Sequence, residues 1–346
     1  MTKQVPTPIS TRVRAWGWFM DRFRSMHIDT MSPSDIAHNQ TMRHVPAPVR
    51  RVLFGARHSG TTVEDRAVPS SNGHAIPVRV YRPRGSGAPS TGLPSAPLPI
   101  VLYLHGGGWT LFGGLDMCDW LPSRVAARVG AVVVAVDYRL APEHPFPAAV
   151  DDCYAALEWV SANDVELGID PNRLAVIGDS AGGNLSAVLA LLARDRSGPP
   201  IAAQGLIYPV TDTTLDDASM LENSDKPVLH RDDMAAFFDY YLGSDPSAPE
   251  RSDIRVAPVR ATSFVGLPSA LVQVGEHDVL RDQGIAYARR FQQAETYVEL
   301  ITYPGAPHGW VTYPLIMKST ADRATDDLVK FLARFLSAPH PSTPVE

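Results

Sequence analysis

The sequence has little cysteine, no long apolar segment and no excess of positive charge. Its 346 residues include two cysteines, Cys118 and Cys153, too few for a disulfide framework. Neither belongs to a CxxC pair or lies near a histidine-rich spacing, so the sequence predicts no metal site. We therefore expect two buried or half-buried thiols in a reducing compartment.

The sequence has no long apolar segment and no excess of positive charge, which argues against a membrane-spanning, a secreted or a nucleic-acid-binding protein. No run approaches the roughly 18 apolar residues of a membrane-spanning helix. The first apolar cluster, Trp16 to Met20, is bracketed by arginines and is too short for a secretion signal. Lys and Arg number 31 against 37 Asp and Glu, whereas phosphate binding needs a basic face. We expect a cytoplasmic protein with no nucleic-acid partner and no stable membrane insertion.

Short apolar runs alternate with helical patterns over most of the chain. The predicted strands cover residues 62–68, 76–81, 100–104, 132–136, 174–177, 206–208, 270–274 and 298–302. The predicted helices cover residues 151–160, 183–193, 285–293 and 322–336. This alternation indicates an α/β protein with a mostly parallel sheet that helices cover on both faces.

Two segments fall outside this alternation. From Val13 to Met26, apolar residues recur at helical spacing, and Met31–Asp35 contains a helix start signal. We expect this N-terminal region to cover a hydrophobic pocket, with contact to a membrane surface as the alternative. Residues 211–250 contain an acidic stretch and a predicted helix over 232–241, which is typical of an inserted lid.

A nucleophile motif lies between a predicted strand and a predicted helix. Ile177 to Gly183 reads Ile-Gly-Asp-Ser-Ala-Gly-Gly, the GxSxG pattern of a sharp strand-to-helix turn. Ser180 is at its centre, and Gly178 and Gly182 remove side chains that would clash in so tight a turn. The sequence therefore predicts Ser180 as a nucleophile that faces the positive end of a helix.

A glycine-rich loop supplies the second feature of acyl-transfer chemistry. Three consecutive glycines follow His105, directly after the strand predicted over 100–104. Such a loop turns backbone N–H groups toward a ligand, which predicts half of an oxyanion hole. The amide of Ala181, directly after the serine, would supply the other half.

The serine needs a base, and the base needs an orienting acid. Among the downstream histidines, His308 lies in a Pro/Gly loop directly after the last predicted strand, where catalytic residues are common. Three carboxylates after the preceding strand compete for the role of acid: Glu276, Asp278 and Asp282. Asp278 is placed to reach His308, whereas Asp282 is better placed to cap the following helix.

Together these segments resemble the hormone-sensitive lipase family of α/β hydrolases, mostly bacterial carboxylesterases. The matching segments are His105–Gly108, Tyr138–Asp152, Gly178–Gly183, Asp278–Asp282 and His308–Gly309. The resemblance covers about residues 60–336, with a looser match in the N-terminal helices. It implies the α/β-hydrolase fold, with a central, mostly parallel eight-stranded sheet flanked by helices and covered by a helical cap.

The resemblance also assigns roles. It makes Ser180 the nucleophile, His308 the base and Asp278 the orienting acid. It draws the oxyanion amides from Gly107, Gly108 and Ala181. It reads the 138–152 segment as structural support whose acids and Arg139 pair internally.

The chain departs from the family's usual pattern beside these groups. Val279 follows the acid where proline is usual, and Trp310 follows the His-Gly pair where phenylalanine is usual. Neither change removes a catalytic group. Asp179 before the serine resembles the GDSAG branch of the family. We expect the substrate to contact Trp109, Asp179 and Trp310.

The sequence thus predicts a serine carboxylesterase that hydrolyses short- to medium-chain acyl esters and needs no cofactor. An amidase, a lactonase and a true lipase share the triad and remain alternatives. The plant hormone receptors of this family lack the histidine that this chain keeps. The predicted catalytic domain covers residues 51–346, with a cap from residues 1–50 and 211–250. The edge strand near residues 298–302 is a candidate homodimer contact.

Overall fold

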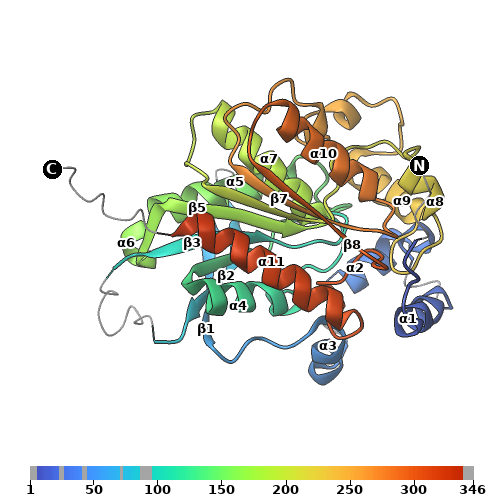
Figure 1. The fold of residues 1–346 in the computed structure, drawn as a ribbon, viewed down its shortest axis with the longest axis horizontal. Coiled ribbons are helices and arrows are strands. Elements are labelled where there is room, and N and C mark those ends of the chain that lie inside the picture. The colour runs from blue at the N-terminus through green and yellow to red at the C-terminus, as the bar shows by residue number, and fades with distance from the viewer. Residues whose placement is uncertain (1–5, 23–26, 41–44, 71–72, 86–95, 338–346) are drawn as a thin grey trace.

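The structure is a computed structural model that describes residues 6–22, 27–40, 45–70, 73–85 and 96–337 (Figure 1). The strands are β1 (Thr61–Pro69), β2 (Ala75–Pro83), β3 (Leu98–Leu104), β4 (Val132–Val136), β5 (Ile169–Asp179), β6 (Ala203–Ile207), β7 (Ser269–Gly275) and β8 (Val298–Tyr303). They form one eight-stranded sheet in the order β1-β2-β4-β3-β5-β6-β7-β8. Strand β2 runs antiparallel to β1 and β4, and the remaining pairs are parallel. The predicted mostly parallel α/β fold is confirmed, and β8 lies at an edge.

The helices surround this sheet. They are α1 (Thr11–Asp21), α2 (Pro33–Asn39), α3 (Ala47–Phe54), α4 (Trp120–Val125), α5 (Ala148–Ala162), α6 (Asp164–Leu167), α7 (Ala181–Asp195), α8 (Ala218–Glu222), α9 (Arg231–Leu242), α10 (Arg281–Gln293) and α11 (Lys318–Leu336). Short 3₁₀ turns lie at η2 (Ile28–Thr30), η3 (Leu115–Met117), η5 (Pro249–Ser252) and η6 (Pro258–Arg260), and a π turn, η4, covers Ala126–Gly130. None of these described helices combines the length and the apolar character that crossing a bilayer requires.

Side-chain alternation along the strands divides the core into two layers. In β3, Ile100, Leu102 and Leu104 join the apolar cluster that includes α5 and α7. The intervening Val101 and Tyr103 join the cluster that includes α4 and α11 on the opposite face. Because successive side chains of a strand point to opposite faces, one apolar run supplies both layers. Figure 1 shows α11 and α4 in front of the sheet, with α5, α7 and α10 behind it.

The segments outside the alternation gather at one side of the molecule. Helices α1, α2, α8 and α9 lie together at the right of Figure 1. Helix α2 begins at the predicted start signal, where Ser32 and Asp35 form a reciprocal capping box. The hydroxyl of Tyr240 in α9 donates to the carbonyl oxygen of Met31 at 2.8 Å, which ties the two regions together. The predicted 13–26 helix is described as far as Asp21, and residues 23–26 lie outside the described residues.

The 138–152 segment is held by the ion pair that the sequence predicts. The backbone N–H and the guanidinium of Arg139 both donate to the buried carboxylate of Asp152, at 2.8–3.2 Å. His144 is partly exposed, with Glu143 as its neighbour at 4.0 Å. Within the segment, Arg139 thus pairs with Asp152, which also lies 3.1 Å from Nε2 of His74 outside it.

Gly205 lets α11 approach the sheet closely, which gives a stability prediction. A Cβ atom there would lie 2.6 Å from Cδ1 of Leu328 and 3.1 Å from Cγ2 of Ile177. Gly205→Ala should therefore lower the free energy of unfolding by about 1–3 kcal/mol through overpacking, as measured by urea denaturation. In a Leu328→Ala background the same change should cost less, since the opposing side chain is gone. An equal loss in both backgrounds would show that the clash with Leu328 is not the cause.

Candidate active site

Ser180 occupies a one-residue turn between β5 and α7. Strand β5 ends at Asp179 and α7 begins at Ala181, which leaves Ser180 with φ 56° and ψ −118°. A Cβ atom on Gly178 would lie 2.2 Å from the carbonyl oxygen of Gly182. One on Gly182 would lie 2.0 Å from that of Leu104, so the turn needs glycine at both positions. The turn places the serine hydroxyl at the N-terminus of a helix.

The structure brings Ser180, His308 and Asp278 into one hydrogen-bonded chain. The Oγ atom of Ser180 lies 3.0 Å from Nε2 of His308. Nδ1 of the same ring lies 2.8 Å from Oδ2 of Asp278. All three residues are buried, with Asp278 only 1% exposed. This is the order of groups in which an imidazole accepts a hydroxyl proton while a carboxylate orients the ring.

The loop that carries Asp278 fixes the orientation of this carboxylate. Its Oδ1 atom accepts a hydrogen bond from the backbone N–H of Leu280 at 2.9 Å, so both oxygens are engaged. The side-chain amide of Asn223 donates to the carbonyl oxygen of Asp278 at 3.1 Å. The hydroxyl of Ser219 donates to the carbonyl oxygen of Val279 at 2.7 Å. Val279, which stands where proline is usual, thus lies in a loop that is hydrogen-bonded to Ser219 in α8 and to Asn223, the residue directly after α8.

The two competing carboxylates have other partners. Glu276 accepts hydrogen bonds from the backbone N–H groups of Gly305 and Thr7, at 2.7 and 3.1 Å. Asp282 accepts from the N–H of Ser219 at 2.9 Å, at the start of α8. The expectation that Asp282 caps its own helix was wrong, since α10 begins at Arg281 without a side-chain cap. Both acids position neighbouring segments, and neither is hydrogen-bonded to His308.

Gly107 and Gly108, two of the three predicted oxyanion donors, line one cavity together with Ser180, and the third, Ala181, directly follows the serine. Gly107 and Gly108 have φ values of 112° and 58°, conformations that side chains disfavour. A Cβ atom on Gly108 would lie 2.1 Å from the ring of Phe237. Within the described part of the chain, the N–H groups of Gly107, Gly108 and Ala181 donate to no protein acceptor. Their role as oxyanion donors stays a prediction.

Asp179 holds the glycine loop against the nucleophile turn. Its Oδ1 atom accepts hydrogen bonds from the hydroxyl of Tyr103 at 2.8 Å and from the N–H of Gly106 at 3.1 Å. A Cβ atom on Gly106 would lie 2.5 Å from Oδ2 of Asp179, so the contact requires glycine. Burial raises the pKa of Asp179, and the Tyr103 hydrogen bond opposes that rise. Asp179 thus joins the two halves of the expected oxyanion site.

His105 lies beside this junction as a buried neutral group. Burial lowers its pKa. Its Nδ1 atom lies 2.7 Å from the carbonyl oxygen of Gly106, and its ring stacks on Tyr138 with centroids 4.2 Å apart. The hydroxyl of Tyr138 donates to the carbonyl oxygen of His105 at 2.6 Å. His105 therefore supports the glycine loop from behind.

A cavity in front of Ser180 contains roughly 580 Å³ of space, part of it open to solvent. Its walls are mainly apolar and come from distant parts of the chain. They include Met20, Ile28, Leu111, Phe112, Val228, Leu229, Phe237 and Tyr313. Asp179 and His308 also line it. Five of these residues come from the two regions that the sequence predicts as the cap, residues 1–50 and 211–250, although the sequence did not single out the individual side chains.

The tryptophans expected to contact substrate lie elsewhere. Trp109 and Trp310 are fully buried, and neither lines the cavity. The indole of Trp109 stacks on Tyr241 with centroids 4.5 Å apart. Trp310 packs edge-on against Tyr208, also at 4.5 Å, and Tyr208 in turn contacts the ring of His308 at 4.3 Å. They act as packing behind the glycine loop and behind the histidine loop.

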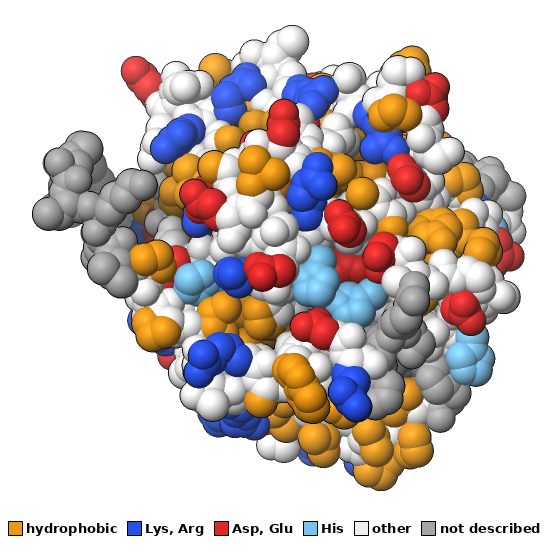
Figure 2. All heavy atoms as spheres, turned by 90° about the vertical axis from the view of Figure 1, so that its right-hand side faces the viewer, with side chains coloured by type: hydrophobic (Ala, Val, Ile, Leu, Met, Phe, Trp, Pro, Cys, Tyr) orange, Lys and Arg blue, Asp and Glu red, His pale blue; other side chains and the backbone are white. Residues whose placement is uncertain are grey.

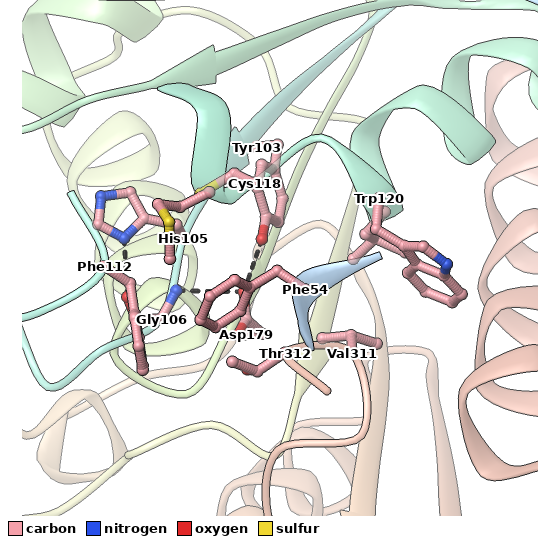
Figure 3. Close-up of a pocket in the computed structure, with 12 residues that line it drawn as sticks. Phe54, Tyr103, His105, Gly106, Phe112, Cys118, Trp120, Asp179, Val311 and Thr312 are labelled. Atoms are coloured by element: carbon pink, nitrogen blue, oxygen red, sulfur yellow. Dashed lines mark hydrogen bonds between the residues drawn. The ribbon is translucent and has the colours of Figure 1, made fainter. Parts of the chain in front are cut away.

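Asp179 also lines a second cavity (Figure 3). It contains about 380 Å³ and shares Phe112, Asp179 and Thr312 with the first cavity. Phe54 and Cys118 also line it.

Among the described residues, some side chains lie close enough together to hold a metal ion. These groups include none of Ser180, Asp278 and His308.

Residues 101–312 match the family described as alpha/beta hydrolase fold. The chain is 46% identical over 277 residues to Carboxylesterase NlhH of Mycobacterium tuberculosis, covering 80% of this chain and 83% of NlhH. It is 37% identical over 279 residues to Ethyl acetate hydrolase of Pseudomonas putida, covering 80% and 83%. The solved structure of a thermostable esterase from Pseudomonas putida superposes with a TM-score of 0.80 at 32% identity, covering 97% of this chain and 100% of that one.

The bridging carboxylate yields a prediction that separates its geometry from its charge. Asp179→Ala should lower kcat/KM for a p-nitrophenyl ester about 10- to 100-fold, because the N–H of Gly106 loses its acceptor and the glycine loop shifts. Asp179→Asn keeps an oxygen at the Oδ1 position and should stay within about fivefold of the wild type. Equal losses in the two variants would contradict a positioning role for Oδ1.

Proposed function

Because the chain belongs to the hormone-sensitive-lipase-like α/β hydrolases and is a carboxylic ester hydrolase, we propose that Ser180, His308 and Asp278 are its catalytic triad. We propose further that its substrates are short- to medium-chain acyl esters. The observation that carries the proposal is the chain of contacts from Ser180 Oγ to His308 Nε2 at 3.0 Å and from His308 Nδ1 to Asp278 at 2.8 Å.

The triad performs the first half of the reaction by acylation. Nε2 of His308 accepts the hydroxyl proton as Oγ of Ser180 attacks the ester carbonyl carbon. Asp278 accepts the Nδ1 hydrogen bond, which leaves the Nε2 lone pair toward the serine and stabilises the imidazolium that forms. His308 then gives the proton to the departing alcohol, and the acyl group remains on Ser180.

Deacylation uses the same groups. His308 removes a proton from water as the water oxygen attacks the acyl carbonyl carbon. When the intermediate collapses, the bond to Oγ breaks, the acid is released, and His308 returns the proton to Ser180. In both halves, the N–H groups of Gly107, Gly108 and Ala181 donate hydrogen bonds to the negatively charged oxygen of the tetrahedral intermediate. Each such donor is typically worth about 2.7–4 kcal/mol of transition-state stabilisation.

The cavity wall supports the proposed substrate class and the role of the cap. Met20 of α1, Ile28 of η2 and Phe237 of α9 close the cavity over Ser180. Residues 1–50 and 211–250 thus act together as the cap, and residues 51–346 outside the inserted segment supply the catalytic groups. The apolar walls suit an acyl chain, and because the volume of about 580 Å³ includes space open to solvent, the enclosed part suits a short chain better than a long one. The resemblance to an ethyl acetate hydrolase agrees with this preference.

Ser180→Ala tests the nucleophile. Hydrolysis of p-nitrophenyl butyrate should fall by at least about 10³-fold, because no acyl-enzyme can form. The matched control is Ser186→Ala in the same helix, whose buried hydroxyl donates to the carbonyl oxygen of Gly182 at 2.8 Å. This control should retain most of the activity. Undiminished hydrolysis by Ser180→Ala would overturn the mechanism.

A chain-length series tests the substrate class. For the wild-type protein, kcat/KM should be highest for butanoyl to hexanoyl p-nitrophenyl esters. For the palmitoyl ester it should be lower by at least about 100-fold. Phe237→Ala widens the cavity and should raise the decanoyl-to-butanoyl ratio about five- to tenfold, since each added methylene gains roughly 0.8 kcal/mol when it is buried. A palmitoyl optimum in the wild type would identify a true lipase instead.

A further inference from the structure

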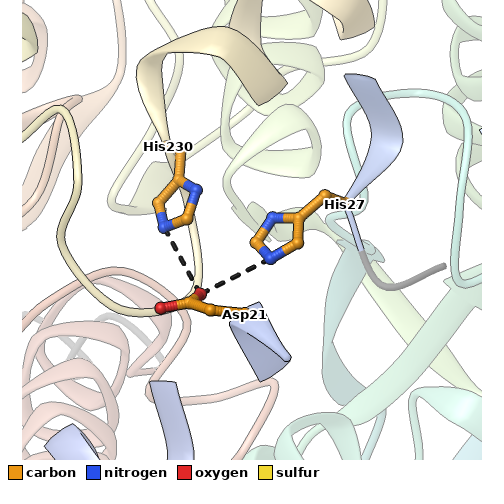
Figure 4. Close-up of side chains that lie close together, drawn as sticks. All are labelled: Asp21, His27 and His230. Carbon is orange, nitrogen blue, oxygen red and sulfur yellow. Dashed lines mark ion pairs between the residues drawn. The ribbon is translucent and has the colours of Figure 1, made fainter. Parts of the chain in front are cut away.

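A cluster of histidine and aspartate side chains joins the N-terminal region to α9, outside the proposed triad (Figure 4). Asp21 ends α1, and His27 directly precedes η2. His230 precedes the first residue of α9, and Asp233 lies in its first turn. The rings of His27 and His230 stack with centroids 4.8 Å apart and planes 15° apart. Two segments far apart in the sequence thus meet through imidazole rings.

The spacing of three ligand atoms fits a shared metal ion. Oδ1 of Asp21 lies 3.4 Å from Nε2 of His27 and 3.7 Å from Nε2 of His230, and Figure 4 shows both rings pointing at this oxygen. Both distances exceed the 2.7–3.2 Å range of hydrogen bonds. Around tetrahedral zinc, with bonds of about 2.0–2.2 Å, neighbouring ligand atoms lie about 3.3–3.6 Å apart. The three atoms lie within 4.8 Å of one another, so small side-chain rotations would complete the geometry.

Asp233 has the position of an outer carboxylate. Its Oδ2 atom accepts a hydrogen bond from the backbone N–H of His230 at 3.0 Å and lies 3.6 Å from Nδ1 of His27 and 3.9 Å from Nδ1 of His230. Histidines that bind a metal through one nitrogen usually direct the other toward a carboxylate. The side chain of Asp233 is 6% exposed, and its Oδ1 atom has no hydrogen-bond partner among the described residues. Nε2 of His230 also lacks one. Buried polar atoms without partners are costly, and a bound cation would remove that cost.

The surrounding surface attracts cations. A cleft lined by this cluster also carries Asp29, Asp225 and Asp232, and Arg231 is the one Lys or Arg side chain among its described lining residues. Figure 2 shows histidine and acidic side chains together on this face of the molecule. A cleft dominated by one sign of charge concentrates ions of the opposite sign.

We propose that Asp21, His27 and His230 bind a divalent transition-metal ion of the zinc class, with water in the remaining position and the Asp233 carboxylate beside both imidazoles. Two imidazoles and a carboxylate form a donor set that suits zinc, copper and nickel better than calcium or magnesium. The ion would link α1 to α9, which supply Met20 and Phe237 to the cavity wall. The prediction of no metal site considered only cysteine and local histidine spacing, whereas these ligands meet only in the folded chain.

Isothermal titration calorimetry of the full chain with zinc chloride tests the site. At about pH 7.5 we expect one ion per chain with a Kd in the micromolar range or below. His27→Gln and His230→Gln should each weaken binding at least about tenfold, and the double variant should abolish it. The matched control, His144→Gln, changes a partly exposed histidine beside Glu143 and should leave the Kd unchanged.

Two further measurements keep the test decisive. Zinc should raise the melting temperature of the wild type and not that of the double variant, because an ion that binds only the native state stabilises it.

Asp21→Asn preserves the shape of a half-exposed side chain and should weaken zinc binding without loss of fold, even if a histidine variant fails to fold. Undiminished affinity in Asp21→Asn and in the double variant, or a wild-type Kd above about 1 mM, would overturn the proposal. Neither readout depends on esterase activity.

Discussion

The turn at Ser180 is the constraint on which the rest of the site depends. A single residue with φ 56° separates the end of β5 from the start of α7. Such a conformation costs a non-glycine residue on the order of 1–3 kcal/mol, so the surrounding structure must hold it in place. The backbone N–H of Ser180 donates to the carbonyl oxygen of Ile207 in β6 at 2.9 Å, and Gly178 and Gly182 allow the close approach of Leu104. The central strands β3, β5 and β6 therefore fix the serine together.

The parallel sheet explains why the other groups meet at this turn. The segments after β3, β5, β7 and β8 carry the glycine loop, Ser180, Asp278 and His308, and parallel strands end at one edge of a sheet. Asp179 then connects the glycine loop to the serine turn through Gly106, and α8 steadies the acid loop through Ser219. The cap regions close the same edge through Met20 and Phe237. The proposed catalytic groups and the cavity thus lie at one edge of the sheet.

The sequence predicted the alternation of strands and helices well. Apolar residues recur every two residues in a strand and about every 3.6 residues in a helix, and these periods are visible without tertiary information. It also singled out Ser180, Asp278 and His308, because each lies in a short segment directly after an apolar run that predicts a strand. It could not decide which way a side chain beside such a loop faces. Trp109 and Trp310 adjoin the glycine and histidine loops in sequence, yet their rings turn into the core against Tyr241 and Tyr208. The partner of Asp282 in α8, and the meeting of His27 with His230, arise only when distant segments pack.

The central claim is that Ser180 is an activated oxygen nucleophile, and covalent labelling tests it most directly. The protein would be treated with a diethyl p-nitrophenyl phosphate, which transfers its phosphoryl group to an activated serine, and then studied by intact mass and peptide mapping. The account predicts one diethylphosphoryl group per chain, located on Ser180, and almost none when His308 is changed to asparagine. An unlabelled wild-type chain, or a label on another residue, would contradict it.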